Sequence, residues 1–250
     1  KGINMVSAID KMTLVKQASA SLANATSAQR TEALLNISKL LLQRSDEIIA
    51  ANLKDLERGE QADMTKSTQD RIRLDSARIS AIADSVIKVT TLPDVLGDVI
   101  RGMTLPNGLQ ISQVRVALGV IGVIYEARPN VTIDIAVLAL KSGNAVVLRG
   151  GRDAQSSNEV LVRLLQDALE LAGLNRDAIH SLDEFGREGG QAMMTAVGLI
   201  DVLIPRGGPG LIKAVVEEST VPVIQTGDGV VHIFVDETAR LDWSVEILHN

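Results

Sequence analysis

Glycine and arginine are concentrated in four short segments, and each segment follows a run of apolar residues. Backbone N–H groups at glycine can approach a ligand closely, and an arginine guanidinium binds phosphate through two parallel hydrogen bonds. The segments therefore predict a site for a phosphorylated ligand, with simple tight turns between strands and helices as the alternative interpretation. They are EARPN (126–130), RGGR (149–152), RGG (206–208) and GDG (227–229).

Several other kinds of catalytic site lack the residues they need. The chain has no cysteine, so a thiol nucleophile and a cysteine-ligated metal are excluded within it. Neither the GxGxxG fingerprint nor a Walker A loop is present. His180, His232 and His249 have no metal-ligand spacing, and we predict no metal site. We interpret the acidic residues of the N-terminal part, such as Asp55 and Glu57, as a solvated helix face.

From position 118 onward, apolar strands alternate with amphipathic helices. Continuous apolar strands separated by helices are typical of a parallel sheet that is covered on both faces, which predicts the α/β class. Ligands bind such sheets at the carboxyl ends of the strands, where the four segments lie. Gly173 is the expected left-handed residue after the second helix. Strands are predicted at 118–125, 145–148, 178–182, 199–204, 221–224 and 231–235, and helices at 131–141, 156–172 and 210–217.

The first ninety or so residues have the apolar spacing of helices. Ser27 is the expected N-cap of one helix, and Ser45 begins another. The tripeptide Pro106-Asn107-Gly108 predicts a tight turn between two strands. This ribbon needs a partner surface, because an isolated hairpin is only marginally stable in water. We therefore divide the chain into a helical region (1–97), a β-ribbon (98–117) and an α/β domain (118–250).

Length and composition favour a folded protein of the cytoplasm. The chain has 250 residues, 46% of them hydrophobic, and a formal net charge of −6. This length supports a large core, and the negative charge argues against a nucleic acid or an anionic membrane as partner. No apolar run reaches the roughly 18–20 residues that span a bilayer. The opening residues also lack the apolar segment of a secretory signal.

One long stretch, LGVIGVIYEARPNVTIDIAVLALKSGNAVVLRGG (118–151), resembles the gamma-glutamyl phosphate reductases of the aldehyde dehydrogenase superfamily. The segments LPNGL (105–109), DVLIPRGGPGLI (201–212) and VPVIQTGDGVVHIFVDE (221–237) extend the likeness. The resemblance implies an aldehyde-dehydrogenase-like fold with a Rossmann-type cofactor domain and a ribbon for oligomerisation. It also implies NADPH-dependent reduction of L-glutamyl 5-phosphate to L-glutamate 5-semialdehyde, a step of proline biosynthesis, by a homo-oligomer. Association with a glutamate 5-kinase stays open.

The resemblance also assigns roles to individual residues. Asn130 lies where the superfamily has the asparagine that donates to the developing oxyanion. Arg149 lies where aldehyde dehydrogenases carry a lysine that contacts the adenine ribose. Arg152 lies where members that prefer NAD often carry a glutamate, and a cation there suits a 2′-phosphate, so we predict NADP. The remaining predicted cofactor-binding residues are Gly150, Gly151, Arg206, Gly207, Gly208 and Gly227.

The chain also departs from the family pattern. Gln225 lies near the superfamily's general-base glutamate, and Val230-Val231 stand before His232 where the family has a different pair. The family's mechanism needs a thiolate nucleophile, and both that cysteine and the catalytic domain carrying it are missing from this chain. We expect the N-terminal part of the reductase. The alternatives are a non-catalytic NADP-binding or regulatory module and the reductase half of a bifunctional kinase–reductase.

Overall fold

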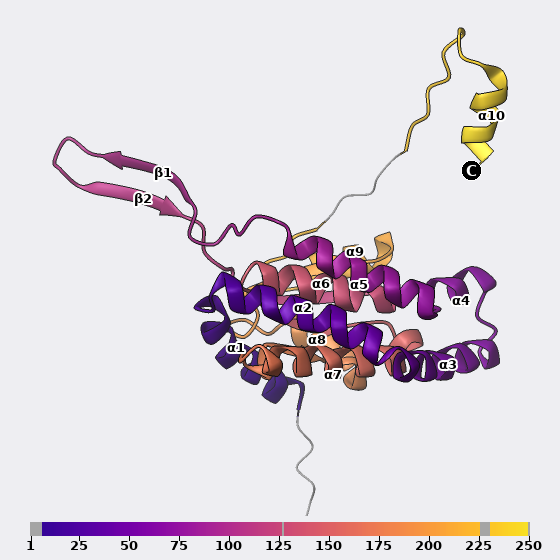
Figure 1. Ribbon diagram of the computed structural model, residues 1–250, viewed down its shortest axis with the longest axis horizontal. Helices are drawn as coiled ribbons and strands as arrows, with labels where there is room; N and C mark the ends of the chain where they lie inside the picture. Colours follow the sequence, from indigo (N-terminus) through magenta and orange to yellow (C-terminus); the bar gives the residue numbers. More distant parts are fainter. Residues whose placement is uncertain (1–6, 127, 226–230, 250) are drawn as a thin grey trace, which may run out of the picture.

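The computed structural model describes residues 7–126, 128–225 and 231–249, and it shows a helical body from which a two-stranded ribbon projects (Figure 1). Helices and parallel strands alternate from β3 onward, which confirms the predicted α/β class. The N-terminal helices are α1 (Ala8–Ala23), α2 (Ser27–Gln43), α3 (Ser45–Gln61), α4 (Lys66–Ile72) and α5 (Ser76–Thr90). The later ones are α6 (Pro129–Lys141), α7 (Gln155–Leu171), α8 (Gly186–Met194), α9 (Pro209–Glu218) and α10 (Leu241–His249).

Four parallel strands form the central sheet in the order β5-β4-β3-β6. In the middle lies β3 (Val120–Tyr125), and all six of its residues are buried because helices cover both faces. The strand begins two residues later than predicted, since Gly119 has a φ of +118°. Its neighbours are β4 (Ala145–Arg149) and β6 (Val202–Arg206), and β5 (Ile179–Ser181) forms one edge. The pairs Ile124–Arg149 and Tyr125–Arg206 bring the carboxyl ends of three strands together.

Each face of the sheet carries its own layer of helices. The crossover helices α6 and α7 lie on one face, and α2, α3 and α5 pack on their outer side. On the other face α1 contacts β3, β4, β5 and α8. Apolar residues of the N-terminal helices and of the sheet belong to one continuous core. No described helix is long and apolar enough to cross a membrane.

Four of the N-terminal helices, α1, α2, α4 and α5, begin at a side-chain cap, whereas α3 has none. For α2 the cap is Thr26, whose hydroxyl accepts from Gln29 N, so the prediction of Ser27 as N-cap is wrong by one residue. The Gln29 side chain returns the bond to Thr26 N, and this reciprocal pair needs the residue spacing that Thr26 offers. The predicted start of α3 at Ser45 is confirmed.

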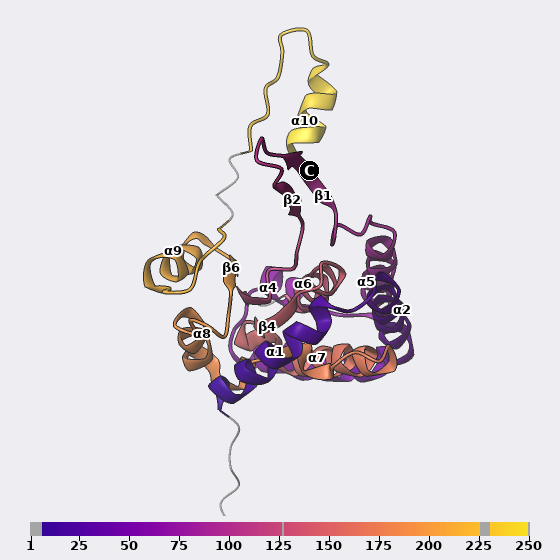
Figure 2. The same ribbon diagram turned by 90° about the vertical axis from the view of Figure 1, so that its left-hand side faces the viewer.

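The ribbon is built from β1 (Val99–Thr104) and β2 (Gln110–Val114), which pair antiparallel. The predicted turn is present, with Gly108 at φ +85° and Leu105 N bonded to Leu109 O. Every residue of both strands is exposed, including apolar side chains on both faces. Figures 1 and 2 show the ribbon extending away from the helices.

Two of the predicted strands do not form. In 221–224 only Val223 makes a strand contact, an isolated parallel bridge to Leu203. Residues 231–235 make no strand, and Val231 and Phe234 are almost fully exposed. An apolar run becomes a strand only where a neighbouring strand accepts its hydrogen bonds, and the described residues offer this run no such neighbour. After it comes α10, an exposed helix that lies apart from the body (Figure 2).

Candidate dinucleotide-binding groove

A groove runs along the carboxyl ends of β3, β4 and β6. It consists of two adjoining cavities of about 360 and 390 Å³, which share Tyr125, Glu126 and Arg128. Val131, Arg206, Gly207 and Gly208 complete the first cavity. Thr68, Arg71, Arg149, Gly151, Asp153 and Leu211 complete the second. Three of the four predicted glycine–arginine segments therefore meet in one place, and the fourth segment, with Gly227, lies outside the described residues.

At the β6 end of the groove, the first turn of α9 presents its backbone to the cavity. Gly208 N donates to Glu126 Oε1 at 2.7 Å, and Glu126 N donates to Arg206 O at 3.1 Å. A methyl group on Gly207 would lie 2.8 Å from the exposed Glu126 side chain, which would have to shift to make room for it. The amide at the N-terminus of α9 thus faces an anion, here a carboxylate of the same chain.

The β4 end of the groove is held in place by hydrogen bonds to the segment that follows β5. Gly150 N donates to Asp183 Oδ1 at 2.7 Å, and Arg149 Nε donates to Gly186 O at 3.2 Å. Arg149 and Gly151, two of the residues predicted to bind the cofactor, line the second cavity. Arg152 does not line either cavity: its side chain is exposed, and its carbonyl accepts a long hydrogen bond from Arg58 Nη2 at 3.4 Å.

Under the groove lies a buried polar network. The Tyr125 hydroxyl bonds Thr132 Oγ1 at 2.6 Å, and Thr132 Oγ1 bonds Asn158 Oδ1 at 2.9 Å. Asn158 Nδ2 then donates to Asp183 Oδ2 at 2.8 Å. Burial raises the pKa of Tyr125 far above its ordinary value, with the nearby Asp183 carboxylate adding to the shift, so the hydroxyl stays protonated. The network joins β3, α6, α7 and the β5 end, and it holds the Gly150 turn in place.

The N-terminus of α7 is capped from another helix. Asp55 of α3 is fully buried, and its carboxylate accepts from Ser156 N at 3.0 Å and Ser157 N at 2.8 Å. Arg58 forms an ion pair with it. The interpretation of Asp55 as part of a solvated face is therefore wrong, whereas Glu57 is exposed as expected. Since Asp55 satisfies the first amides of α7, this helix end is closed to an external anion.

Asn130, the residue implied as the oxyanion donor, lies in the first turn of α6 and is half-buried. Its Nδ2 donates to Asp134 Oδ2 at 3.2 Å. Burial raises the pKa of Asp134, and the hydrogen bond from Asn130 opposes that shift. Asn130 does not line the two cavities, although its neighbours Arg128 and Val131 do. Gln225 is exposed, and Val230 lies outside the described residues.

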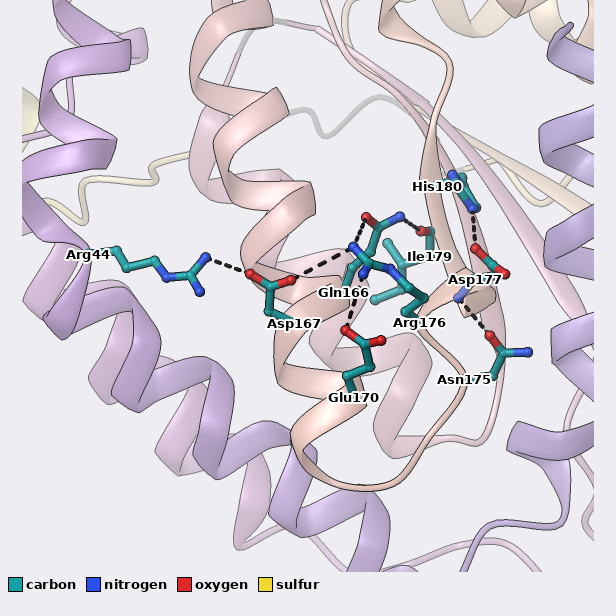
Figure 3. A network of polar contacts seen from close by, with 9 residues as sticks. All are labelled: Arg44, Gln166, Asp167, Glu170, Asn175, Arg176, Asp177, Ile179 and His180. Carbon is teal, nitrogen blue, oxygen red and sulfur yellow. Dashed lines mark hydrogen bonds and ion pairs between the residues drawn. The ribbon is translucent and has the colours of Figure 1, made fainter. Parts of the chain in front are cut away.

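A second polar cluster lies away from the groove, where α7 meets β5 (Figure 3). Asp167 binds Arg44, the residue between α2 and α3, at 2.7 Å and approaches Arg176 at 3.8 Å. Gln166 Nε2 donates to Ile179 O at 2.8 Å. These contacts fasten α2 and the edge strand to α7, and they contribute nothing to the groove.

The comparison with known proteins decides the family. The family model for the aldehyde dehydrogenase family matches residues 6–249. The chain belongs to the aldehyde dehydrogenase family. It is 52% identical over 241 residues to the gamma-glutamyl phosphate reductase of Leifsonia xyli subsp. xyli, with 96% of this chain and 57% of that relative covered. The corresponding protein of Kineococcus radiotolerans is 53% identical over 235 residues, with coverage of 94% and 54%.

A solved structure supports the same relationship. The crystal structure of gamma-glutamyl phosphate reductase from Thermotoga maritima matches this chain with a TM-score of 0.89 at 38% identity, covering 96% of this chain and 58% of that one. The predicted aldehyde-dehydrogenase-like fold is thereby confirmed. The chain spans a little over half the length of the curated relatives it matches.

Sequence reasoning missed several residues of the groove and its support. Arg71 and Thr68 come from α4, a short helix that the apolar spacing did not reveal. Asp183 lies two residues after the end of β5, and the rule that parallel strands share one carboxyl edge could have found it. Asn158 and Thr132 lie on buried helix faces, where no local signal separates a polar bridge from a surface residue.

Proposed function

We propose that this chain supplies the cofactor-binding part of a gamma-glutamyl phosphate reductase. The reaction converts L-glutamyl 5-phosphate, NADPH and a proton into L-glutamate 5-semialdehyde, NADP⁺ and inorganic phosphate. The observation that carries the proposal is the groove at the carboxyl edge of the sheet, with arginines on three of its loops. The roughly 50% identity to reductases of that name supports the choice of substrate.

The groove fits an extended, multiply phosphorylated ligand. Glycines at 207 and 208 leave the α9 backbone accessible, so that Gly208 N can serve a pyrophosphate oxygen. Arg206 lies beside that position, and Arg149 with Gly151 forms the opposite end, where an adenosine ribose would bind. The exposed guanidinium of Arg152 is suited to a 2′-phosphate at the rim. When bound, NADPH supplies the hydride of the reaction.

The proposed reaction also needs a nucleophile, which these residues do not supply. An acyl phosphate becomes an aldehyde by way of a thioester, which requires a thiol, and the 250 residues contain none. That group therefore has to come from outside these 250 residues. Asn130 is the proposed oxyanion donor: one amide proton is bonded to Asp134, and the second is available to an acyl oxygen.

The proposal includes an assembly and a compartment. We place the enzyme in the cytoplasm as a homo-oligomer that pairs through the exposed β1–β2 ribbon, whose apolar side chains need a partner surface. A glutamate 5-kinase is the proposed supplier of the unstable acyl phosphate.

The cofactor part of the proposal is tested by direct binding. Titration of the chain with NADPH and with NADH, followed by nucleotide fluorescence, should give tighter binding of NADPH. Arg152→Glu should reverse or abolish that preference, and Arg163→Glu, an exposed arginine on the outer side of α7, is the matched control. An unchanged preference in Arg152→Glu would contradict the assignment of Arg152.

The substrate part is tested with the full-length protein. It should reduce NADP⁺ when glutamate 5-semialdehyde and inorganic phosphate are supplied together. Binding of NADPH by a full-length protein that has no such activity would favour the alternative, a non-catalytic NADP-binding or regulatory module.

A further inference from the structure

We propose that Arg71 of α4, together with Arg149, also binds the ribose 2′-phosphate of the dinucleotide, in addition to Arg152 at the rim. The inference rests on the proposed function and adds to it a specificity residue from the N-terminal helices. Arg71 lines the second cavity with Arg149 and Gly151. A helix far from the sheet in sequence thus places a cation at the loop that follows β4.

The backbone that carries Arg71 is fixed on both sides. On one side, Asp70 Oδ1 pairs with Arg78 Nη2 at 2.7 Å, which ties α4 to α5. On the other side Ile72 is fully buried, and its carbonyl accepts from Asn52 Nδ2 at 2.7 Å. Asn52 Oδ1 also accepts from Leu74 N at 2.7 Å. An arginine that projects from an anchored segment loses less freedom on binding an anion than one on a mobile loop.

One buried cluster anchors both walls of the cavity. Asn52 Nδ2 lies 3.0 Å from Ser157 Oγ at the start of α7, and Ser157 is held by Asp55. The same asparagine therefore fixes the end of α4 and the turn that carries Gly151 and Asp153. The distance between Arg71 and the β4 loop is set by this cluster, and no ligand is needed to establish it.

The charges in the cavity favour a dianion. Three arginines line it (Arg71, Arg128 and Arg149) against two carboxylates (Glu126 and Asp153). Glu126 is bonded to Gly208 N at the other end of the groove. Within the described part of the chain, Arg71 forms no ion pair, and the carboxylate of the adjacent Asp70 is paired with Arg78. A phosphate monoester can form ion pairs with these arginines, whereas the ribose hydroxyl of NAD is uncharged and cannot.

The test compares Arg71→Ala with Arg73→Ala. Arg73 is an exposed arginine two residues away that does not line the cavity, which makes it the matched control. The probes are adenosine 2′,5′-bisphosphate and adenosine 5′-phosphate, titrated into each protein by calorimetry. We expect Arg71→Ala to bind the bisphosphate more than tenfold more weakly, with little change for adenosine 5′-phosphate. Arg71→Lys should recover part of the loss, and Arg73→Ala should bind both probes like the parent protein.

The other outcomes each have a meaning. Equal weakening for both probes would overturn the proposal, since it would place Arg71 at a phosphate common to both or show a general loss of structure. Unchanged binding in Arg71→Ala would overturn it as well. If the parent protein binds neither the two probes nor NADPH, the proposed function itself fails, which is a different result from a failure of Arg71 alone.

Discussion

Asp55 accepts hydrogen bonds from both the backbone N–H (2.8 Å) and the hydroxyl (2.7 Å) of Ser157, a residue 102 positions further along the chain. An N-cap usually comes from the residue that precedes the helix. Here the carboxylate of α3 performs that role for α7 instead. The turn between β4 and α7, which forms one wall of the groove, is therefore held by the N-terminal helices.

Replacing Asp55 should reduce stability strongly. Asp55→Ala leaves the amides of Ser156 and Ser157 without their acceptor in a buried position, and we expect a loss of about 2–4 kcal/mol in the free energy of unfolding. Urea denaturation followed by circular dichroism measures the change. Glu57→Ala, on the exposed face of the same helix, is the control and should stay within about 0.5 kcal/mol. Equal effects for the two variants would mean that the cap contributes little.

A methyl group at Gly150 should disturb the network under the groove. It would overlap the Asn158 side-chain amide and lie 3.1 Å from the Tyr125 ring. We expect Gly150→Ala to cost about 1–3 kcal/mol and to weaken dinucleotide binding, because the turn must shift. Gly210→Ala in α9 has no atom within 4 Å of the added methyl and should be neutral or slightly stabilising. Thermal melting with and without NADPH separates the two variants.

The Glu126 carboxylate should compete with the cofactor. It occupies the Gly208 amide, which the proposed function assigns to a pyrophosphate oxygen. Glu126→Gln removes the negative charge and keeps an acceptor oxygen, so we expect NADPH to bind several-fold more tightly. The gain should shrink as ionic strength rises, because part of it is electrostatic. Weaker binding in Glu126→Gln would show that the carboxylate positions the α9 loop for the ligand.

Acidification should destabilise the protein partly through His180, which lies beside the cluster in Figure 3. Burial lowers the pKa of His180 below its ordinary value of 6.5, against the opposing effect of the hydrogen bond to Asp177. His180 therefore takes up its proton at a lower pH in the folded state than in the unfolded state. The stability of the neutral form is fully present above about pH 6.5 and is lost as the pH falls through the lowered pKa.

The corresponding variant is His180→Gln, compared with His249→Gln on the exposed helix α10. Urea midpoints measured from pH 8 to pH 5 should decline less steeply in His180→Gln than in the parent protein. His249→Gln should follow the parent. A parallel decline in all three proteins would assign the acid sensitivity to other groups.

Lys16 and Asp201 form one ion pair but should contribute very differently to the stability of the protein. Lys16 Nζ lies 2.8 Å from Asp201 Oδ2, and both side chains are about one-third exposed. Lys16→Met should therefore cost less than about 1 kcal/mol. Asp201→Ala should cost about 1–3 kcal/mol, because Asp201 also accepts from the backbone of the fully buried Val120 at 2.8 Å. The Lys16 effect should fade in high salt, whereas the part of the Asp201 effect that comes from the Val120 amide should persist.

Where a residue's own neighbours decide its conformation, the sequence was a good guide. Gly173 has the predicted left-handed backbone, with φ +69°, and the helix before it ends where expected. The buried strands β3, β4, β5 and β6 and the helices α6 and α7 were found within a few residues, because their apolar pattern is local, whereas α8 between β5 and β6 was not predicted. The convergence of the glycine–arginine loops followed from a rule about parallel sheets that applies whatever the detailed packing.

Contacts between distant segments could not be read in this way. Asp55 has the local surroundings of a surface residue, and only the position of α7 makes it a buried cap. Arg71 belongs to a helix of seven residues, too short for an apolar face to be recognised. The run at 231–235 shows the opposite error, since its composition is that of a strand but it has no partner among the described residues.

The order of the sheet has a consequence for synthesis. One neighbour of β3 is β4, which follows at once through α6, but the other is β6, and the contact between Val120 and Asp201 spans 81 residues. Until the ribosome has released β6, one side of the apolar strand β3 carries unpaired amides and carbonyls. Nascent chains that stop before about residue 200 therefore present an open edge on which other chains can add strands. Such chains should depend on chaperones, whereas chains that include β6 can close the sheet themselves.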